Sequence, residues 1–289
     1  MEPIAGPSVW ERAAFHRAAD LAIVGGGIVG LFAALFHQRR FPRHRVVVLE
    51  RGAFPSGASA RNAGFACFGS PSELLADMDR EGADAALARV EERWRGLREL
   101  RAELSDAAIG FEPCGGYELY REGDGLHARV ADRFEALNDA LRPILGPGAF
   151  RWDGGAPERF GLRGVRHAAF TPLEGALDSG LLLRALMSKA AGAGAELRFG
   201  ARVTALEEDA HGVALRLAGG GSMRAERVLV ATNGYTPALL PRLDVLPARG
   251  QVLLTAPVPG LRLHGTFHME EGFYYFRHCQ GGVLLGGGR

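Results

Sequence analysis

Short apolar runs near the start of the chain alternate with glycine and charged residues. Residues 21–24 (LAIV) are a β-branched run, and the glycine-rich stretch 25–30 (GGGIVG) follows directly. Residues 31–37 are almost entirely apolar and are followed by basic residues and a proline, which indicates a buried helix. Residues 45–50 (RVVVLE) form a second apolar run that ends in an acid. This order predicts a strand, a glycine turn, a helix and a parallel strand, which together make one βαβ unit.

The middle of the chain has a different pattern, dominated by amphipathic helices. Residues 53–72 are rich in Gly, Ser and Ala and predict a loop, which ends where Ser70, Pro71 and Glu73 form a capping box with proline at the first helical position. Residues 83–104 carry apolar residues at helical spacing among many charges, which predicts a long surface helix. Alternation over 116–121 predicts a half-exposed strand, and a helix is expected over 124–142.

The pattern changes again from residue 176. Asp178 can cap a helix that runs through Leu181, Leu182, Leu186 and Met187. Short strands are then expected at 196–200, 202–207, 212–217 and 227–232, and further strand-like runs at 251–255, 272–276 and 283–285. A parallel α/β beginning, a mixed α+β interruption and a resumption near 176 predict two interleaved domains rather than two consecutive ones.

Composition limits the possible functions without indicating one. The 289 residues are enough for one large or two medium domains, and the net charge of +1 provides no field for nucleic acid or an anionic membrane. The cysteines Cys67, Cys114 and Cys279 are widely separated, so neither a disulfide framework nor a metal site is expected. The N-terminal residues lack the apolar region of a secretory signal, and no run is long enough to span a membrane. These observations favour a cytoplasmic protein.

The glycine stretch carries the clearest chemistry. Gly25 permits a tight turn, Gly27 lets the backbone approach a pyrophosphate, and Gly30 lets helix and sheet pack closely. The start of the following helix offers N–H groups and the positive end of a dipole to phosphates. Glu50, which ends the next strand, can accept hydrogen bonds from a ribose diol. The unit therefore predicts dinucleotide binding, with a glycine-rich turn of an unrelated α/β fold as the alternative. It does not decide between nicotinamide and flavin.

Three further stretches accompany this unit in a fixed order: 56–65, 231–236 and 247–251. Together with 22–30, Glu50 and Arg51, they resemble the FAD-dependent amine and amino-acid oxidoreductases, the superfamily of D-amino-acid oxidase, glycine oxidase and sarcosine oxidase. The resemblance implies an α/β fold in which a Rossmann-like FAD-binding domain with a parallel sheet is interleaved with an α+β substrate domain built on a mixed or antiparallel sheet. The FAD-binding domain is expected over 15–82 and 160–246, and the substrate domain over 83–159 and 247–289.

The resemblance also implies which residues contact FAD. The loop 59–65 would run beside the pyrophosphate and isoalloxazine, Val203 would meet the adenine through its backbone, and 231–234 would close over the adenosine end. Arg61 and Asn62 stand where some relatives tether flavin to a histidine, so non-covalent FAD is expected. Without the resemblance, loop caps are the favoured explanation of these two residues, and an ordinary turn after a strand explains Asn233-Gly234. The implied cofactor-binding residues are Gly25, Gly27, Ile28, Val29, Gly30, Glu50, Arg51, Ser59, Arg61, Asn62, Ala63, Gly64, Val203, Ala231, Thr232 and Gly234.

Catalysis in this class needs few protein groups, because the flavin takes a hydride at N5 from the carbon that bears the amine. A substrate carboxylate is usually held by an arginine fork, often with a tyrosine hydroxyl beside it. The predicted catalytic residues are Tyr275, Arg277 and Arg249. Alternation puts Tyr275 and Arg277 on one face of a strand and Tyr274 and Phe276 on the other, and one pair is expected to face the flavin. A half-buried sheet with an exposed arginine explains the pattern equally well.

The expected function is therefore FAD-dependent oxidation of the C–N bond of a small amino acid or amine. Relatives of this type usually continue for several tens of residues beyond the position of Arg289, so the substrate domain is expected to be incomplete. An open sheet edge would then be covered by a partner or an oligomer. The alternatives are a catalytically impaired or truncated FAD-binding relic, a subunit completed by a partner, and a nicotinamide-dependent dehydrogenase.

Overall fold

The computed structural model describes residues 8–288. The expectations about the two ends of the chain concern residues 1–7 and Arg289, which lie outside the described residues. The chain divides into two compact units. The first contains the chain up to Arg61 together with Leu183–Ala248, and the second contains Asn62–Leu182 together with the chain from Arg249 onward. Each unit is therefore built from two separate stretches of sequence, as the interleaved pattern predicts.

The borders differ from those expected at 82 and 160, since 62–82 and 160–182 belong to the second unit, whereas the border expected at 247 is close to the one at Ala248. Phe68 and Leu74 are buried in the core of that unit, and the strand Val165–Thr171 pairs with Gly116–Arg121 in its sheet. Long-range packing thus decides where the two units begin and end, and the amphipathic pattern of the sequence does not reveal this packing.

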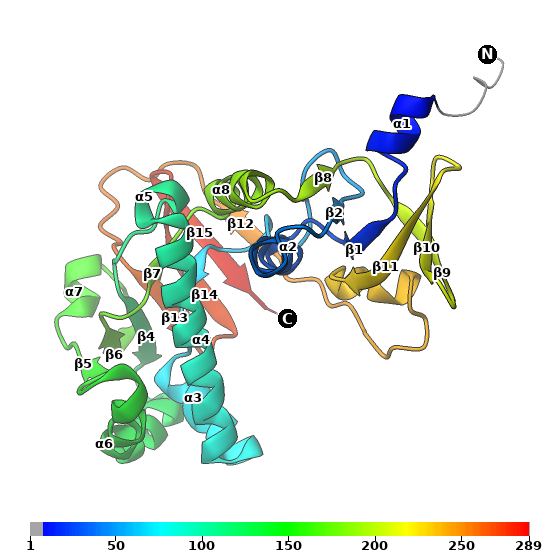
Figure 1. Ribbon diagram of the computed structural model, residues 1–289. Helices are drawn as coiled ribbons and strands as arrows, with labels where there is room; N and C mark the ends of the chain where they lie inside the picture. The colour runs from blue at the N-terminus through cyan, green and yellow to red at the C-terminus, as the bar shows by residue number, and fades with distance from the viewer. Residues whose placement is uncertain (1–7, 289) are drawn as a thin grey trace. The chain divides into compact units, whose positions relative to one another are not determined.

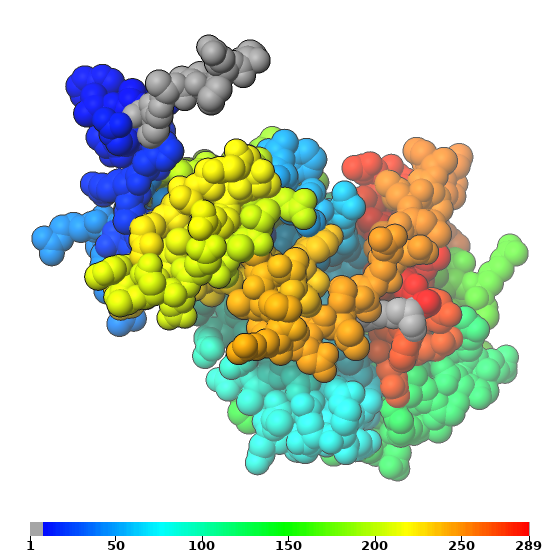
Figure 2. All heavy atoms as spheres, turned by 90° about the vertical axis from the view of Figure 1, so that its right-hand side faces the viewer, coloured from blue at the N-terminus to red at the C-terminus, as the bar shows by residue number. Residues whose placement is uncertain are grey.

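The first unit is built around a six-stranded sheet in the order β8-β2-β1-β11-β10-β9 (Figure 1). Four neighbouring strands are parallel, and β10 and β9 extend the sheet as an antiparallel meander. In Figure 2, the atoms of this meander lie together in yellow-green and yellow on the surface of the unit. The elements are α1 (Val9–Ala14), β1 (Ala19–Val24), α2 (Ile28–Arg40), β2 (Val46–Leu49), α8 (Ser179–Gly192, which begins in the second unit), β8 (Glu196–Arg198), β9 (Val203–Asp209), β10 (Gly212–Leu217), β11 (Ser222–Val230) and the 3-10 helix η1 (Asn233–Ala238).

The apolar runs of β1 and β2 are buried on both faces. Ile23 and Val48 pack on the face that carries Ala34 of α2, whereas Val24 and Leu49 pack with residues of the meander. A strand buried on both faces reads as a continuous apolar run, which is why the sequence shows no alternation there. The βαβ unit predicted from the sequence is confirmed.

The second unit contains a seven-stranded sheet in the order β12-β15-β14-β13-β4-β6-β5 and a separate two-stranded pair, β3-β7 (Figure 1). Strand β6 is absent from the sequence prediction, and β14 and β15 are longer than the runs that predict them. The elements are β3 (Phe65–Ala66), α3 (Pro71–Glu81), α4 (Ala83–Leu104), α5 (Asp106–Ile109), β4 (Gly116–Arg121), α6 (Gly125–Leu145), β5 (Arg151–Trp152), α7 (Ala156–Phe160), β6 (Val165–Thr171), β7 (Gly175–Ala176), β12 (Val252–Leu254), β13 (Thr266–Met269), β14 (Tyr274–Cys279) and β15 (Gly282–Gly287).

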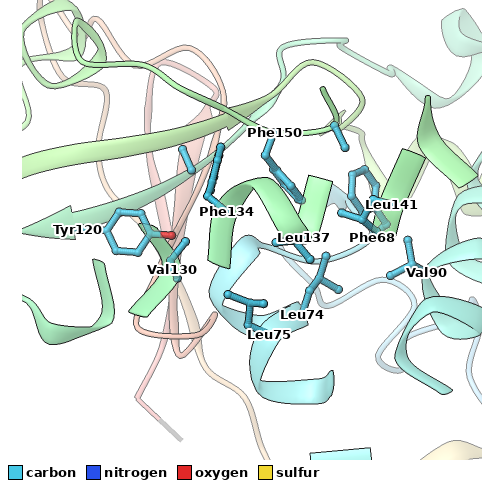
Figure 3. Close-up of a cluster of buried hydrophobic side chains, with 12 residues drawn as sticks. Phe68, Leu74, Leu75, Val90, Tyr120, Val130, Phe134, Leu137, Leu141 and Phe150 are labelled. Atoms are coloured by element: carbon cyan, nitrogen blue, oxygen red, sulfur yellow. The ribbon is translucent and has the colours of Figure 1, made fainter. Parts of the chain in front are cut away.

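The two faces of this sheet carry different cores. On one face, Tyr120 and Ala169 join a cluster formed with α3, α4 and α6, in which Figure 3 shows Leu74 and Leu137 close together. The capping box at Ser70 begins α3 as predicted, with Glu73 accepting a hydrogen bond from the Ser70 N–H. On the other face, aromatic rings form a row across four strands, which consists of Phe170, Tyr117, Phe267 and Phe276 with neighbouring centroids 4.7, 5.2 and 4.9 Å apart.

Candidate cofactor and substrate site

The turn between β1 and α2 requires glycine at two positions. Gly25 has a φ of +115°, and a Cβ there would overlap the carbonyl oxygen of Ala231. A Cβ on Gly30 would overlap the carbonyl oxygen of Gly25. Both glycines thus allow backbone-to-backbone contact that any other residue would prevent. The contact at Gly25 also links the turn to the end of β11, where the Ala231 N–H donates to the Val24 carbonyl at 2.8 Å.

The first turn of α2 begins at a glycine and is contacted by one side chain from the loop that follows β2. Gly27 is the N-cap and provides no side-chain cap, while a Cβ there would lie 2.8 Å from Ser59 Oγ. That hydroxyl accepts a hydrogen bond from the Ile28 N–H at 3.0 Å. The Val29 side chain is 70% exposed. A helix start leaves further N–H groups without an intrahelical partner, and its dipole favours negative charge.

Glu50 follows β2 and is held in place by the glycine turn. Its side chain is 9% exposed, and its two oxygens accept hydrogen bonds from the N–H groups of Gly26 (3.0 Å) and Gly52 (2.9 Å). A carboxylate has about four acceptor sites, so each oxygen keeps a lone pair for a further donor. The Glu50 carbonyl accepts from the Ala201 N–H at 2.8 Å, which ties this corner to the segment leading into the buried Val203.

The segment after β11 lies in the first unit, beside the glycine turn and Glu50. Thr232 Oγ1 lies 3.1 Å from Thr236 Oγ1, and a Cβ on Gly234 would lie 3.0 Å from the Pro247 Cβ. The Arg51 guanidinium lies 3.9 Å from the centroid of the exposed Tyr235 ring. Sequence reasoning missed this contact, because Arg51 lies far from Tyr235 in the chain and no local pattern indicates the pairing.

These features fit a dinucleotide cofactor with an adenosine diphosphate portion. The bare glycine backbone and the α2 start suit a pyrophosphate, and the free lone pairs of Glu50 suit a ribose diol. Arg61, the last residue of this unit before the chain enters the other, is exposed.

In the second unit, Asn62 organises the start of β3. Its Oδ1 accepts hydrogen bonds from the Gly64 N–H (2.8 Å) and from Ser179 Oγ (2.7 Å). Gly64 has a φ of +67°, and its carbonyl accepts from the Leu177 N–H at 2.8 Å. The buried Ala63 lies between them. These bonds join the loop to the segment after β7 rather than leaving it as an isolated turn.

The predicted catalytic residues Tyr275 and Arg277 lie on the same face of β14, opposite the aromatic row that contains Phe276. The Tyr275 ring contacts that of Phe65, with centroids 5.5 Å apart. Arg277 donates from Nε to the Ala63 carbonyl (2.6 Å) and from Nη2 to the Leu177 carbonyl (3.1 Å). Arg249 is exposed, and within residues 8–288 no hydrogen bond joins it to Tyr275 or Arg277.

A buried polar cluster lies on the same sheet face and was missed by sequence reasoning. Glu174 Oε1 accepts from the N–H groups of Phe68 (2.9 Å) and Gly69 (3.4 Å), while Oε2 lies 3.9 Å from His268 Nε2. Burial raises the pKa of Glu174 to about 8, with the nearby carboxylates of Glu73 and Glu118 adding to the effect. Burial also lowers the pKa of His268 to about 4. Both side chains are therefore neutral near pH 7.

Glu118 is the other acid of this cluster, and it is fully satisfied. It accepts hydrogen bonds from Ser70 Oγ (3.1 Å), from the N–H (2.9 Å) and hydroxyl of Ser72, and from Tyr120 Oη (2.5 Å). Burial raises its pKa, and these donors oppose the change. The one sequence sign of the cluster is the acid Glu118 in strand β4, which is buried from Gly116 to Tyr120 rather than half-exposed as predicted. Across residues 8–288, no group of three or more His, Cys, Asp or Glu side chains is arranged to hold a metal ion.

Comparison with known proteins agrees with this geometry. The family model described as DAO, FAD dependent oxidoreductase, matches residues 20–289, so the chain belongs to this family of FAD-dependent oxidoreductases. The chain is 30% identical over 284 residues to the glycine oxidase of Geobacillus kaustophilus (strain HTA426), covering 94% of this chain and 70% of that protein. It is 28% identical over 293 residues to the probable oxidoreductase OrdL of Rhizobium meliloti (strain 1021), covering 94% of this chain and 64% of that protein.

Solved structures show the same fold. The crystal structure of the Geobacillus kaustophilus glycine oxidase matches with a TM-score of 0.68 at 30% identity, covering 94% of this chain and 71% of that one. The L-amino acid deaminase from Proteus vulgaris matches with a TM-score of 0.69 at 20% identity, covering 95% and 61%, which shows the fold alone. The predicted α/β fold and the FAD cofactor are thus confirmed, and the nicotinamide alternative is wrong at the level of the family. No helix in the described part of the chain has the length and apolar character needed to cross a membrane.

Proposed function

We propose that this chain oxidises the C–N bond of a small amino acid or amine with non-covalently bound FAD. One observation carries the proposal. The glycine turn 25–30 packs against the Ala231 carbonyl, and Glu50 lies beside this turn, in a member of the FAD-dependent oxidoreductase family. The similarity to a glycine oxidase supports an amine-bearing substrate.

When bound, FAD supplies the oxidation itself by accepting two electrons and the hydrogen from the carbon that carries the amine. The α2 start and Ser59 would hold and orient the pyrophosphate, and Glu50 would accept hydrogen bonds from the ribose. In the second unit, the Tyr275 hydroxyl and the exposed Arg249 guanidinium are the candidates for binding a substrate carboxylate. Binding of the substrate carboxylate would then orient the amine-bearing carbon toward the flavin, so that the substrate is held in the reactive geometry.

Two other possibilities from the sequence stay open and lead to different outcomes. A catalytically impaired form would bind FAD without turning over any amine. A subunit completed by a partner or by oligomerisation would gain turnover only in the assembled state. The similarity to the L-2-hydroxyglutarate dehydrogenase of Escherichia coli (strain K12), at 25% identity over 250 residues, adds a hydroxy acid to the compounds worth testing.

The deciding experiment is the absorbance spectrum of the purified protein, recorded anaerobically before and after each member of a substrate panel. The panel contains glycine, N-methylglycine, larger amino acids of both configurations, a polyamine and a 2-hydroxy acid. Flavin bands that are bleached by an amine and return with an acceptor are expected. Protein that neither carries nor takes up FAD contradicts the proposal, and bleaching by the hydroxy acid alone replaces C–N with C–O oxidation.

A further inference from the structure

Arg277 lies where three strands of the second unit meet. Its side chain extends from β14, its Nε donates to the Ala63 carbonyl before β3, and its Nη2 donates to the Leu177 carbonyl after β7. These carbonyls are 214 and 100 residues away from it in the chain. One guanidinium thus joins segments that no local interaction would hold together.

The carbonyls that Arg277 binds are at the end of a short ladder. Strand β3 pairs with β7 through Phe65 opposite Ala176, and the Leu177 N–H donates to the Gly64 carbonyl. Ala63 and Leu177 are both buried, so their carbonyl oxygens need a donor from within the protein. Arg277 is the donor that the structure gives to each of them.

The backbone around Gly64 is shaped to receive this guanidinium. Gly64 has a φ of +67°, and a Cβ there would overlap the Leu177 carbonyl oxygen and lie 2.9 Å from Arg277 Nη2. The absence of a side chain lets the guanidinium lie directly against the backbone. The glycine at position 64 and the arginine at 277 therefore form one arrangement, although they belong to distant parts of the sequence.

This arrangement uses one of the two guanidinium edges through which Arg277 could hold a carboxylate. A guanidinium grips a carboxylate through two parallel N–H groups on one of its edges. The Nε–Nη2 edge of Arg277 is occupied by the two backbone carbonyls.

We propose that Arg277 is a positioning residue, which holds the Asn62–Phe65 loop in the shape that binds FAD. The inference rests on the proposed role of this loop in FAD binding. Asn62 adds a second tie through its bonds to Gly64 and Ser179, so the loop is held from both sides. Substrate carboxylate recognition then falls to Tyr275 or Arg249 rather than to Arg277.

The test compares Arg277→Ala and Arg277→Lys with Arg121→Ala, which removes an exposed arginine from the same unit. FAD affinity is measured by titrating the apoprotein and following flavin fluorescence. Losing charge-assisted hydrogen bonds to two buried carbonyls should raise the Kd for FAD by about 10-fold or more in Arg277→Ala. Arg277→Lys, which keeps the charge and can keep one bond, should lie between wild type and Arg277→Ala, and Arg121→Ala should match wild type.

Two further readouts separate positioning from substrate binding. The ratio of KM for an amino acid to KM for the amine that lacks its carboxylate should be unchanged in Arg277→Lys. Hydrogen exchange of the Gly64 and Leu177 amides, measured without FAD, should accelerate in both variants. A selective rise in KM for the carboxylate-bearing substrate with unchanged FAD affinity overturns the inference, and so does unchanged exchange at the two amides. If wild-type protein fails to bind FAD, the proposed function fails, and amide exchange still decides whether Arg277 positions the loop.

Discussion

The buried Glu174 offers the sharpest quantitative prediction. Its carboxyl group has a pKa of about 8 in the folded protein, against a usual value of 4.5, because burial removes it from water. The folded state therefore holds this proton more tightly than the unfolded state does. Raising the pKa by this amount corresponds to about 5 kcal/mol in the free energy of unfolding. This contribution is fully present below pH 4.5 and is lost progressively as pH rises to about 8.

The variant Glu174→Gln tests this magnitude, because glutamine has nearly the same shape and cannot ionise. Its carbonyl oxygen can accept the hydrogen bonds from Phe68 and Gly69, and its amide nitrogen can take the place of Oε2, which lies 3.9 Å from His268 Nε2. We expect the variant to be about as stable as wild type at pH 4.5 and more stable above pH 7. The steep fall in wild-type stability between these values should be much reduced.

Urea unfolding followed by tryptophan fluorescence and circular dichroism, at pH values from 4.5 to 8.5, gives the required free energies. Glu207→Gln is the matched control, since Glu207 is exposed and paired with Arg216, and it should leave the slope over this range unchanged. Identical pH profiles for wild type and Glu174→Gln would refute the reasoning, because they would mean that Glu174 is not held as a neutral acid in the folded state.

Four other changes have defined outcomes. Gly30→Ala puts a Cβ against the Gly25 carbonyl oxygen and should destabilise the protein by about 1–3 kcal/mol and abolish FAD uptake, measured by absorbance, whereas Gly57→Ala has open space and should do neither. Glu50→Gln sets an amide against the N–H of Gly26 or Gly52 and should cost about 1–3 kcal/mol and weaken FAD binding by fluorescence titration. Phe267→Ala removes the centre of the aromatic row and should cost about 3–5 kcal/mol in urea unfolding. His268→Gln removes a group whose pKa falls from 6.5 to about 4, so the part of wild-type stability that is present above pH 6.5 and lost toward pH 4 should no longer vary with pH.

Specific results would contradict each of these. Normal FAD uptake by Gly30→Ala would mean that the turn is not packed as described, and unchanged FAD affinity in Glu50→Gln would separate Glu50 from the cofactor. A cost below about 1 kcal/mol for Phe267→Ala would show that the aromatic row contributes little to stability. If the stability of His268→Gln falls between pH 6.5 and pH 4 as steeply as that of wild type, another group causes the pH dependence.

The βαβ unit shows how much a local pattern can determine. Its strands are apolar throughout, its turn contains glycines at the positions where side chains would overlap backbone, and its acid lies at the end of β2. Every part of this signature lies within about thirty residues, so the sequence predicts both the fold of the unit and its ligand class. The start of α3 at Ser70 and the cap of α8 by Asp178, whose Oδ1 accepts from Gly180 and Leu181, were predictable for the same reason.

Strand β6 shows the opposite case. Its residues alternate only weakly, with small side chains at Ala168 and Ala169 on the buried positions. The strand is stabilised by pairing with β4, and a pairing between distant segments leaves no periodic mark in either one. The borders of the two units follow from such pairings, which is why they differ from the expected positions.

The sequence alone determined the family, the cofactor turn and the α/β class, because these depend on short-range spacing and on backbone conformations that only certain residues adopt. Only the tertiary structure decided what surrounds Arg277 and Glu174. Arg277 is a plausible substrate clamp in the sequence, but in the fold it binds two backbone carbonyls 214 and 100 residues away. Glu174 resembles any turn acid, but its backbone donor at Phe68 lies 106 residues away, and burial keeps it neutral. The chemistry of a side chain depends on its solvation and partners, and long-range packing sets both.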